Sequence, residues 1–383
     1  MIPHKCFIKS YLLLITPILV MASCGKDHDK ILPGLSFTEE LSIVGDGTNP
    51  EKSFLRAYDS SVGPEGNIYV AGYRIPRVYV YSPDGSFVHS FGKQGRGPGE
   101  FLLPRGSALI DSTYYIWDQR QRRMSWFSLS GEHLGQQVSK DIYSPVEIFE
   151  LGDQKLLMYA DRFRSQLSKS QLAHVYSTNF ANSQSDFLRV GSFNEGLEDV
   201  DRALASPKAW SIEVLSPKRV LFVPRIYSNA IFEYVQTKSG HWELSKKHDG
   251  LFRLKPYSIT EEKTGRSPDR SYYSAHMNEP LHLIIHNQSR GLYKVRDHIF
   301  HFIQIDRNNR RVFGAEVFTS NFNLIGFIPI KSIPITNGRV NNIDWYVDEA
   351  DQKGNFYFRE IYQDSSRIRK MHLDLNELHV YMD

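Results

Sequence analysis

Six arginines recur in this sequence, each at or just after the end of a short segment rich in aromatic and β-branched residues. They are Arg74, Arg120, Arg162, Arg225, Arg307 and Arg359. A guanidinium group can donate two parallel hydrogen bonds to one carboxylate. If the six positions come together in space, the sequence predicts a pocket for an anionic ligand, such as an acidic saccharide or a peptide carboxylate.

A second interpretation of these arginines is structural. Each side chain would then cap a loop carbonyl or pair with an acidic neighbour on its own segment. The acidic neighbours are Asp118, Asp161, Asp306 and Glu360. Both interpretations stay open at this point. Binding to a panel of acidic glycans, measured after Arg120, Arg162 and Arg225 are replaced by Ala, distinguishes them.

Histidines gather late in the chain, but their spacing does not favour a metal. His282 and His286 would lie close enough to share an ion only on a helix. On a strand they are about 13 Å apart. The chain also has no Gly-x-Ser-x-Gly elbow, no Walker loop and no His-Glu-x-x-His motif. We therefore predict no metal site, no catalytic residue and no cofactor.

The N-terminus carries the marks of export. Lys5 and Lys9 precede an apolar run, 11–20, that is shorter than the roughly 20 residues of a transmembrane helix. Small residues, 21–23, then lead to Cys24. This pattern resembles the lipobox of bacterial lipoproteins, which implies that Cys24 is acylated and becomes the new N-terminus. The alternative is an ordinary signal peptide that is cut nearby, with Cys24 a spectator.

The lipobox resemblance predicts a membrane partner. Gly25 follows the cysteine where Asp would signal retention, which fits passage to the outer membrane. Cys6 leaves with the signal peptide, so the mature chain cannot form an internal disulfide. We expect an outer-membrane lipoprotein of the cell envelope that faces the periplasm or the cell surface.

Charge excludes one class of partner. The formal net charge of +3 falls to +1 when Lys5 and Lys9 leave with the signal peptide. Such a chain has no excess of positive charge with which to bind nucleic acid. Aromatic residues make up 13% of the chain, and Gly and Pro are spread along it, as is typical of a turn-rich all-β protein.

An internal repeat must position the arginines. Its clearest marker is a strand-like segment that recurs six times, at 66–72, 113–118, 155–161, 219–224, 298–305 and 354–359. In the first copy, two further strands follow at 78–81 and 87–91, separated by the turn 82–85. Six copies of four antiparallel strands, none able to bury both faces alone, predict an all-β, six-bladed β-propeller.

The repeat also predicts the blades. Their spans are 52–92, 103–139, 143–191, 209–250, 289–331 and 341–383, with an insertion at 251–288. Loops between second and third strands would share one face with the inter-blade crossings, so the arginines would ring one mouth of the channel. Residues 41–44 are a candidate outer strand that closes the last blade, and residues 378–381 compete for that position.

One crossing carries a family resemblance. The run Phe91-Gly-Lys-Gln-Gly-Arg-Gly-Pro-Gly-Glu-Phe101, followed by Pro104, resembles the inter-blade connection of NHL-repeat propellers and of TolB-like six-bladed propeller lipoproteins. The resemblance implies binding of proteins, peptides or saccharides. Propeller lactonases instead use Glu, Asn and Asp at the channel, and Glu147, Asn229 and Asp344 are the residues that could approach it here.

The predicted organisation is a signal peptide at 1–23, a lipidated linker at 24–39 and the propeller at 40–383. The predicted function is an envelope-anchored, non-catalytic propeller that binds a glycan, a peptide or an outer-membrane protein. The alternatives are a hydrolase or lyase with a metal in the central channel, and a structural scaffold. Three converging carboxylate, His or Asn side chains would favour the enzyme, an Arg and aromatic mouth the binder, and a flat apolar patch the scaffold.

Overall fold

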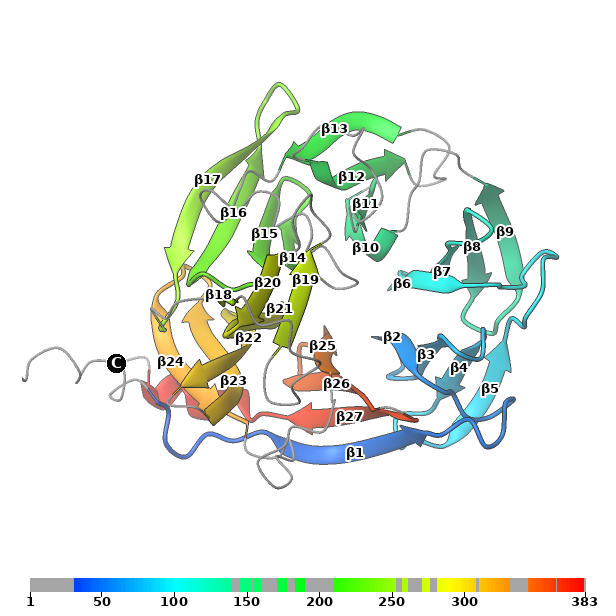
Figure 1. Cartoon of the computed structure of the whole chain (residues 1–383), viewed down its shortest axis with the longest axis horizontal. Coiled ribbons are helices and arrows are strands. Elements are labelled where there is room, and N and C mark those ends of the chain that lie inside the picture. The colour runs from blue at the N-terminus through cyan, green and yellow to red at the C-terminus, as the bar shows by residue number, and fades with distance from the viewer. Residues whose placement is uncertain are drawn as a thin grey trace, which may run out of the picture.

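The computed structural model describes residues 31–381 except 139–144, 153, 160–170, 178–182, 190–209, 253–256, 261–270, 276–280, 308–309, 331–343 and 363. Six four-stranded antiparallel sheets stand radially around a central axis (Figure 1). The all-β, six-bladed propeller predicted from the repeats is confirmed. Among the described residues, no helix is long and apolar enough to span a membrane.

The first three blades follow one another along the chain. The first is β2 (Ala57–Val62), β3 (Ile68–Gly72), β4 (Val78–Tyr81) and β5 (Phe87–Phe91). The second is β6 (Pro104–Ile110), β7 (Thr113–Asp118), β8 (Arg123–Ser128) and β9 (His133–Val138). The third is β10 (Pro145–Leu151), β11 (Gln154–Tyr159), β12 (Gln171–Ser177) and β13 (Ser183–Arg189). In each blade the strand order follows the chain order, from the channel outward.

The fourth blade is β14 (Trp210–Ser216), β15 (Arg219–Pro224), β16 (Ala230–Gln236) and β17 (Trp242–Asp249). The fifth is β21 (Asn287–Val295), β22 (His298–Arg307), β23 (Arg310–Thr319) and β24 (Leu324–Pro329). It begins two residues earlier than its predicted span. Between them, the insertion forms a three-stranded sheet of β18 (Tyr257–Thr260), β20 (Leu281–Ile285) and β19 (Ser271–Ala275), in that order.

The N-terminal strand closes the sixth blade. This blade contains β25 (Asp344–Ala350), β26 (Asn355–Ile361) and β27 (Ser366–His372), and β1 (Thr38–Gly45) pairs antiparallel with β27. In Figure 1, β1 runs along the outer edge of the ring below β27. Residues 378–381 do not supply the closing strand, because they belong to a 3₁₀ helix, η1 (Leu375–Tyr381), in which Leu378 is fully buried.

Tight turns give the strands of each blade their antiparallel course. In the turn 82–85 the amide of Gly85 donates to the carbonyl of Ser82 at 2.8 Å. Gly85 has a φ of +85°, which a residue with a Cβ adopts only with strain. The same type of bond closes the outer hairpins of the second and fourth blades, at Gly131 and Gly240. The turn residues noted in the sequence therefore set the repeat.

The core lies between blades. Tyr69 of the first blade and Tyr114 of the second stack with ring centroids 5.7 Å apart, and Phe91 meets Phe127 at 5.0 Å. Phe101, from the glycine-rich crossing, is fully buried beside Phe127. Aromatic side chains are large enough to fill the space between two twisted sheets. The wedges between blades thus hold the inner strands around the channel.

Candidate functional site

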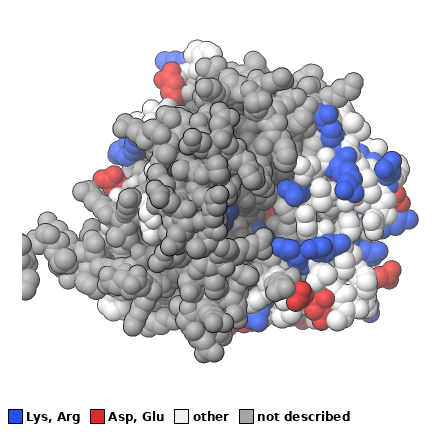
Figure 2. Space-filling view, in the orientation of Figure 1, with Lys and Arg blue, Asp and Glu red and all other residues white. Residues whose placement is uncertain are grey.

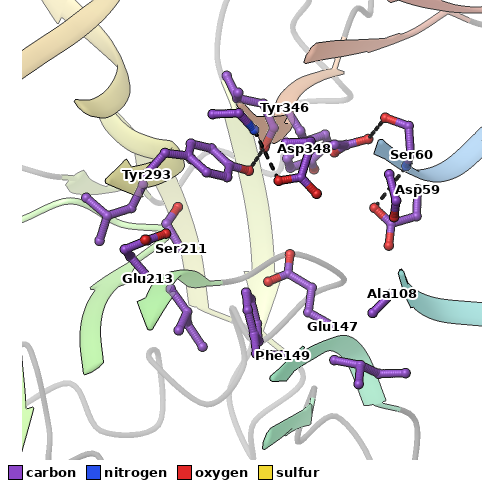
Figure 3. Close-up of a pocket in the computed structure, with 18 of the residues that line it drawn as sticks. Asp59, Ser60, Ala108, Glu147, Phe149, Ser211, Glu213, Tyr293, Tyr346 and Asp348 are labelled. Atoms are coloured by element: carbon purple, nitrogen blue, oxygen red, sulfur yellow. Dashed lines mark hydrogen bonds between the residues drawn. The ribbon is translucent and has the colours of Figure 1, made fainter. Parts of the chain in front are cut away.

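The innermost strands of all six blades enclose a cavity of about 320 Å³ in the central channel (Figure 3). Its walls come from β2, β6, β10, β14, β21 and β25, with Gln352 just beyond the last of these. A site of this kind depends on the closed ring, because no single blade supplies more than one part of the wall. The propeller therefore converts six repeats into one polar chamber.

One layer of this wall is built from equivalent positions. Asp59, Ser107, Glu147, Ser211, Ser289 and Tyr346 line the cavity from successive blades. Each lies opposite a residue in the second half of the second strand of its own blade. Side chains two positions before or after these on the same strand lie on the same face, at a different depth of the channel. The repeat thus sets the depth, and the residue type at that depth varies from blade to blade.

Three carboxylates from different blades face the same space. Figure 3 shows the Glu147 carboxyl group pointing into the open part of the cavity and the Asp348 carboxyl group turned toward Ser60, with Asp59 beside Ser60. Asp59 accepts a hydrogen bond of 3.1 Å from the Ser107 hydroxyl, and Asp348 accepts one of 2.8 Å from the Ser60 hydroxyl. These bonds join neighbouring inner strands and fix the orientation of two of the three carboxylates.

Asp348 is also paired with a buried arginine. Arg359 Nε lies 2.7 Å from its Oδ2, and a terminal nitrogen of the same guanidinium lies 3.2 Å from its Oδ1. Burial alone would lower the pKa of Arg359, but the Asp348 carboxylate outweighs it and raises this pKa above its ordinary value. The guanidinium also lies over the Tyr346 ring at 4.8 Å. Arg359, which is outside the lining, therefore holds Asp348 in position in the cavity wall.

Glu213 is an acid of the cavity whose pKa is raised. Burial raises the pKa of its carboxyl to about 8, and the charge of Glu349 adds to the rise. It lies below Ser211 on β14 and near the Tyr293 ring in Figure 3. A carboxyl group with this pKa is largely protonated at pH 7, so it can donate a hydrogen bond or a proton to a bound molecule.

Acidic side chains outnumber basic ones in the lining. The acids are Asp59, Asp111, Glu147, Glu150, Glu213, Asp348 and Glu349, and the bases are Arg290 and Lys294. Within the part of the chain that the structure describes, no group of three His, Cys, Asp or Glu side chains is arranged to hold a metal ion. The lining as a whole favours a ligand without net negative charge.

The structure separates the arginines predicted as a group. Arg74 and Arg120 are exposed on loops, whereas Arg359 lies inside β26 and is 2% exposed. Arg225 follows β15 and donates from Nε to Gln288 Oε1 at 3.3 Å. None of these four is in the lining of the cavity. Arg162 lies outside the described residues, and so does the Arg307 side chain at the end of β22.

Loops between second and third strands do lie against the inter-blade crossings. The Gln121 side chain donates to the carbonyl of Glu100 at 3.0 Å, and the amide of Arg74 donates to the carbonyl of Leu55 at 3.3 Å. Figure 2 shows Lys and Arg side chains gathered on the right-hand part of one face, where β6–β9 lie in Figure 1. The first two blades thus present basic groups to solvent.

The other predicted candidates fall in different places. Glu147 lines the cavity, Asn229 lies on the loop after β15 and is 9% exposed, and the Asp344 side chain is outside the described residues. Cys24 is also outside them. Sequence reasoning did not single out Ser289 or Asp348. Ser289 lies near the start of the inner strand β21, and Asp348 lies in the middle of the inner strand β25. These positions follow from an alignment of the second strands, which was the available signal.

Comparisons with known proteins support the fold. Residues 64–192 match a family model, DUF5128, described as a 6-bladed beta-propeller. A member of the DUF4221 family from Bacteroides vulgatus has a similar solved structure, with a TM-score of 0.53 and 8% sequence identity over 89% of this chain and 98% of that one. A Bacteroides fragilis protein described as exported gives a TM-score of 0.52 and 14% identity, over 89% and 95%.

Virginiamycin B lyase from Staphylococcus aureus has a TM-score of 0.45 and 10% identity, over 88% of this chain and 99% of that one. A search of curated proteins gave no match. The two solved structures with TM-scores above 0.5 show a shared fold alone, so the function has to be argued from the cavity itself.

Proposed function

We propose that this protein is an exported lipoprotein of the cell envelope whose propeller binds a small, hydroxyl-rich ligand, a neutral or amino sugar, in the central channel. The observation that carries the proposal is the cavity of about 320 Å³ with a polar wall drawn from all six inner strands. This size lies at the lower end of the range for small-molecule sites, about 300–1,000 Å³.

The chemistry of the wall supports a sugar. Carboxylates such as Asp59 and Glu147 accept hydrogen bonds from hydroxyl or ammonium groups, and protonated Glu213 donates one. The ring of Phe149 supplies an apolar surface in the same wall. Because acids dominate the lining, an acidic saccharide would be repelled from the channel. Exposed Arg74 and Arg120 would bind such a partner, glycan or protein, on the outer loops instead.

Titration calorimetry tests the channel proposal. The full chain is titrated with neutral, amino and acidic monosaccharides, before and after Glu147→Gln. We expect binding of a neutral or amino sugar that weakens by about 10- to 100-fold in the variant, since a hydrogen bond to a charged group contributes about 1.5–3 kcal/mol. Glu243→Gln, on the exposed outer strand β17, is the matched control and should bind normally. Equal binding by both variants, or preference for acidic sugars, contradicts the proposal.

The lipid anchor is proposed from the sequence around Cys24, as is kinship with NHL-repeat and TolB-like propellers from the crossing at 91–101. In cells that process lipoproteins, the wild-type protein should partition into detergent and carry acyl chains in its mass spectrum. Cys24→Ser should abolish both properties. A wild-type chain that stays in the aqueous phase would exclude the anchor and leave the channel proposal intact.

A further inference from the structure

A chain of hydrogen bonds leads from the cavity wall into the fifth blade. The hydroxyl of Ser289 lies 2.9 Å from His301 Nε2, and His301 Nδ1 lies 2.9 Å from Glu316 Oε2. Ser289 lines the cavity, and His301 and Glu316 are fully buried behind it. We refer to Ser289, His301 and Glu316 as the Ser–His–Glu chain. A hydroxyl, an imidazole and a carboxylate in this order can activate the hydroxyl as a nucleophile.

Strand register produces this arrangement. His301 on β22 and Glu316 on β23 are directly opposite each other, so their side chains lie on one face of the sheet. Ser289 on β21 is opposite Ile303, two residues from His301 and therefore on the same face. The register shifts between Ser289 and Gly291, which leaves Arg290 as an extra residue. Such a bulge bends a strand and redirects a side chain.

Neighbouring groups hold Glu316 and His301 in place. Glu316 accepts hydrogen bonds from the amide of Leu251 at 2.6 Å and from the Tyr227 hydroxyl at 2.7 Å. Burial, together with the Glu316 carboxylate, raises the pKa of Tyr227 well above its ordinary value, so this hydroxyl remains a donor. The Tyr227 ring meets the imidazole edge-on, with centroids 4.5 Å apart. With Glu316 as acceptor, Nδ1 carries the proton and Nε2 is available to accept one.

We propose that the Ser–His–Glu chain is an acyl-transfer site and that its substrate is an ester of the ligand bound in the channel, an O-acylated sugar. Ser289 Oγ attacks the ester carbonyl, its proton passes to His301 Nε2, and the sugar oxygen leaves with that proton. Water then attacks the acyl-enzyme, again giving a proton to His301, and releases the carboxylic acid and Ser289. This substrate class rests on the proposed sugar site, and Glu316 acts as a positioning residue.

The equivalent positions of the other blades argue for a specific role of Ser289. Ser107 occupies the same level in the second blade, but its hydroxyl donates to Asp59, a carboxylate. Ser211 of the fourth blade lies 2.7 Å from the Ser289 hydroxyl, with either oxygen as the donor. Of the described serines in this layer, Ser289 has the imidazole contact. It is therefore the serine from which a base can remove a proton.

Covalent labelling of the full chain tests the nucleophile. A small fluorophosphonate is added, and the modified peptide is identified by mass spectrometry in the wild-type chain. We expect modification of Ser289. Ser289→Ala should abolish this label because it removes the nucleophile, and His301→Gln should slow labelling by about 100-fold or more, as expected for loss of a general base. Matched controls are Ser125→Ala and His372→Gln, which alter a buried serine and a hydrogen-bonded histidine outside the cavity. They should label normally.

Hydrolysis of 4-nitrophenyl acetate and of O-acetylated monosaccharides gives the second readout. Glu316→Gln should lower kcat with little change in KM, because it misorients His301 without touching the substrate. Label on another residue, or no label on a folded chain, overturns the acyl-transfer proposal. Sugar binding that survives in such a chain upholds the channel proposal alone. Labelling of Ser289 without binding of any sugar contradicts the channel proposal and the substrate class, and leaves the nucleophile established.

Discussion

At the scale of single residues, the channel combines acids that are held in two different states. Asp348 is paired with Arg359 at 2.7 Å, whereas burial raises the pKa of Glu213 to about 8. Carboxyl groups whose environments differ in this way can take up different roles toward one ligand, as acceptor and as donor. The proposed sugar site uses both.

Glu213 makes the stability of the protein depend on pH. Its folded pKa of about 8 exceeds the ordinary value of 4.5. The favourable contribution of protonated Glu213 is therefore complete below about pH 4.5 and is lost as the pH rises to about 8. Relative to Glu213→Gln, the free energy of unfolding of the wild type should fall by up to about 1.4 kcal/mol per pH unit in this window.

Chemical denaturation at a series of pH values measures this difference. Glu243→Gln, an exposed carboxyl on β17, corrects for the change in surface charge. A difference between wild type and Glu213→Gln that stays constant from pH 5 to pH 8 would contradict the raised pKa.

At the scale of elements, β1 is joined to β27 by ion pairs of unequal burial. Arg369, 3% exposed, pairs with Glu39 of β1 and with Glu360 of β26, the latter at 2.9 Å. Its neighbour Lys370 pairs with Glu40 at 2.7 Å, but both side chains are partly exposed. Breaking a buried pair leaves an uncompensated charge in the interior, whereas an exposed pair contributes little.

We therefore expect Arg369→Ala to lower the free energy of unfolding by about 3–5 kcal/mol. Lys370→Ala, on the same strand, should lower it by less than about 1 kcal/mol. Thermal and urea unfolding of the two variants provides the comparison. A loss for Arg369→Ala as small as that for Lys370→Ala would contradict a large contribution from the buried pair of Arg369 with Glu360.

The strands could be predicted because the information that defines them is local. Alternating apolar residues and glycine turns, as at 82–85, mark each blade in the sequence. The Ser–His–Glu chain could not be predicted, because it depends on a bulge at Arg290 and on the pairing of β21, β22 and β23. Arg74 and Arg359 have equivalent places in the repeat. However, β26 extends to Ile361, so Arg359 lies within a sheet and is buried.

At the scale of the whole molecule, the two ends of the described part of the chain meet between the fifth and sixth blades. The ring centroid of Phe37 lies 5.7 Å from that of Phe302 and 5.5 Å from that of Phe356. The Tyr381 hydroxyl donates to the carbonyl of Pro33 at 3.0 Å. A chain that begins at residue 46 lacks these contacts and the whole of β1. Compared with a chain that begins at residue 31, its Tm should fall by about 10 °C or more.

Limited proteolysis of the two shortened chains shows where the ring opens. Cleavage of the shorter one should start in the sixth blade, at β27, which has lost its outer neighbour. Equal melting temperatures and equal cleavage patterns would mean that the ring closes without its N-terminal strand.

The chain is already fastened to the rim at its first described residues. Ile31 bridges to Phe327 on β24, the outer strand of the fifth blade, and the Leu32 amide donates to the same residue at 3.0 Å. Cys24 precedes Ile31 by seven residues, which reach no farther than about 25 Å. With the proposed lipid on Cys24, so short a connecting segment would hold the propeller at the membrane by the outer edge of its fifth blade. Both mouths of the channel would then open sideways along the bilayer, toward molecules that diffuse parallel to it.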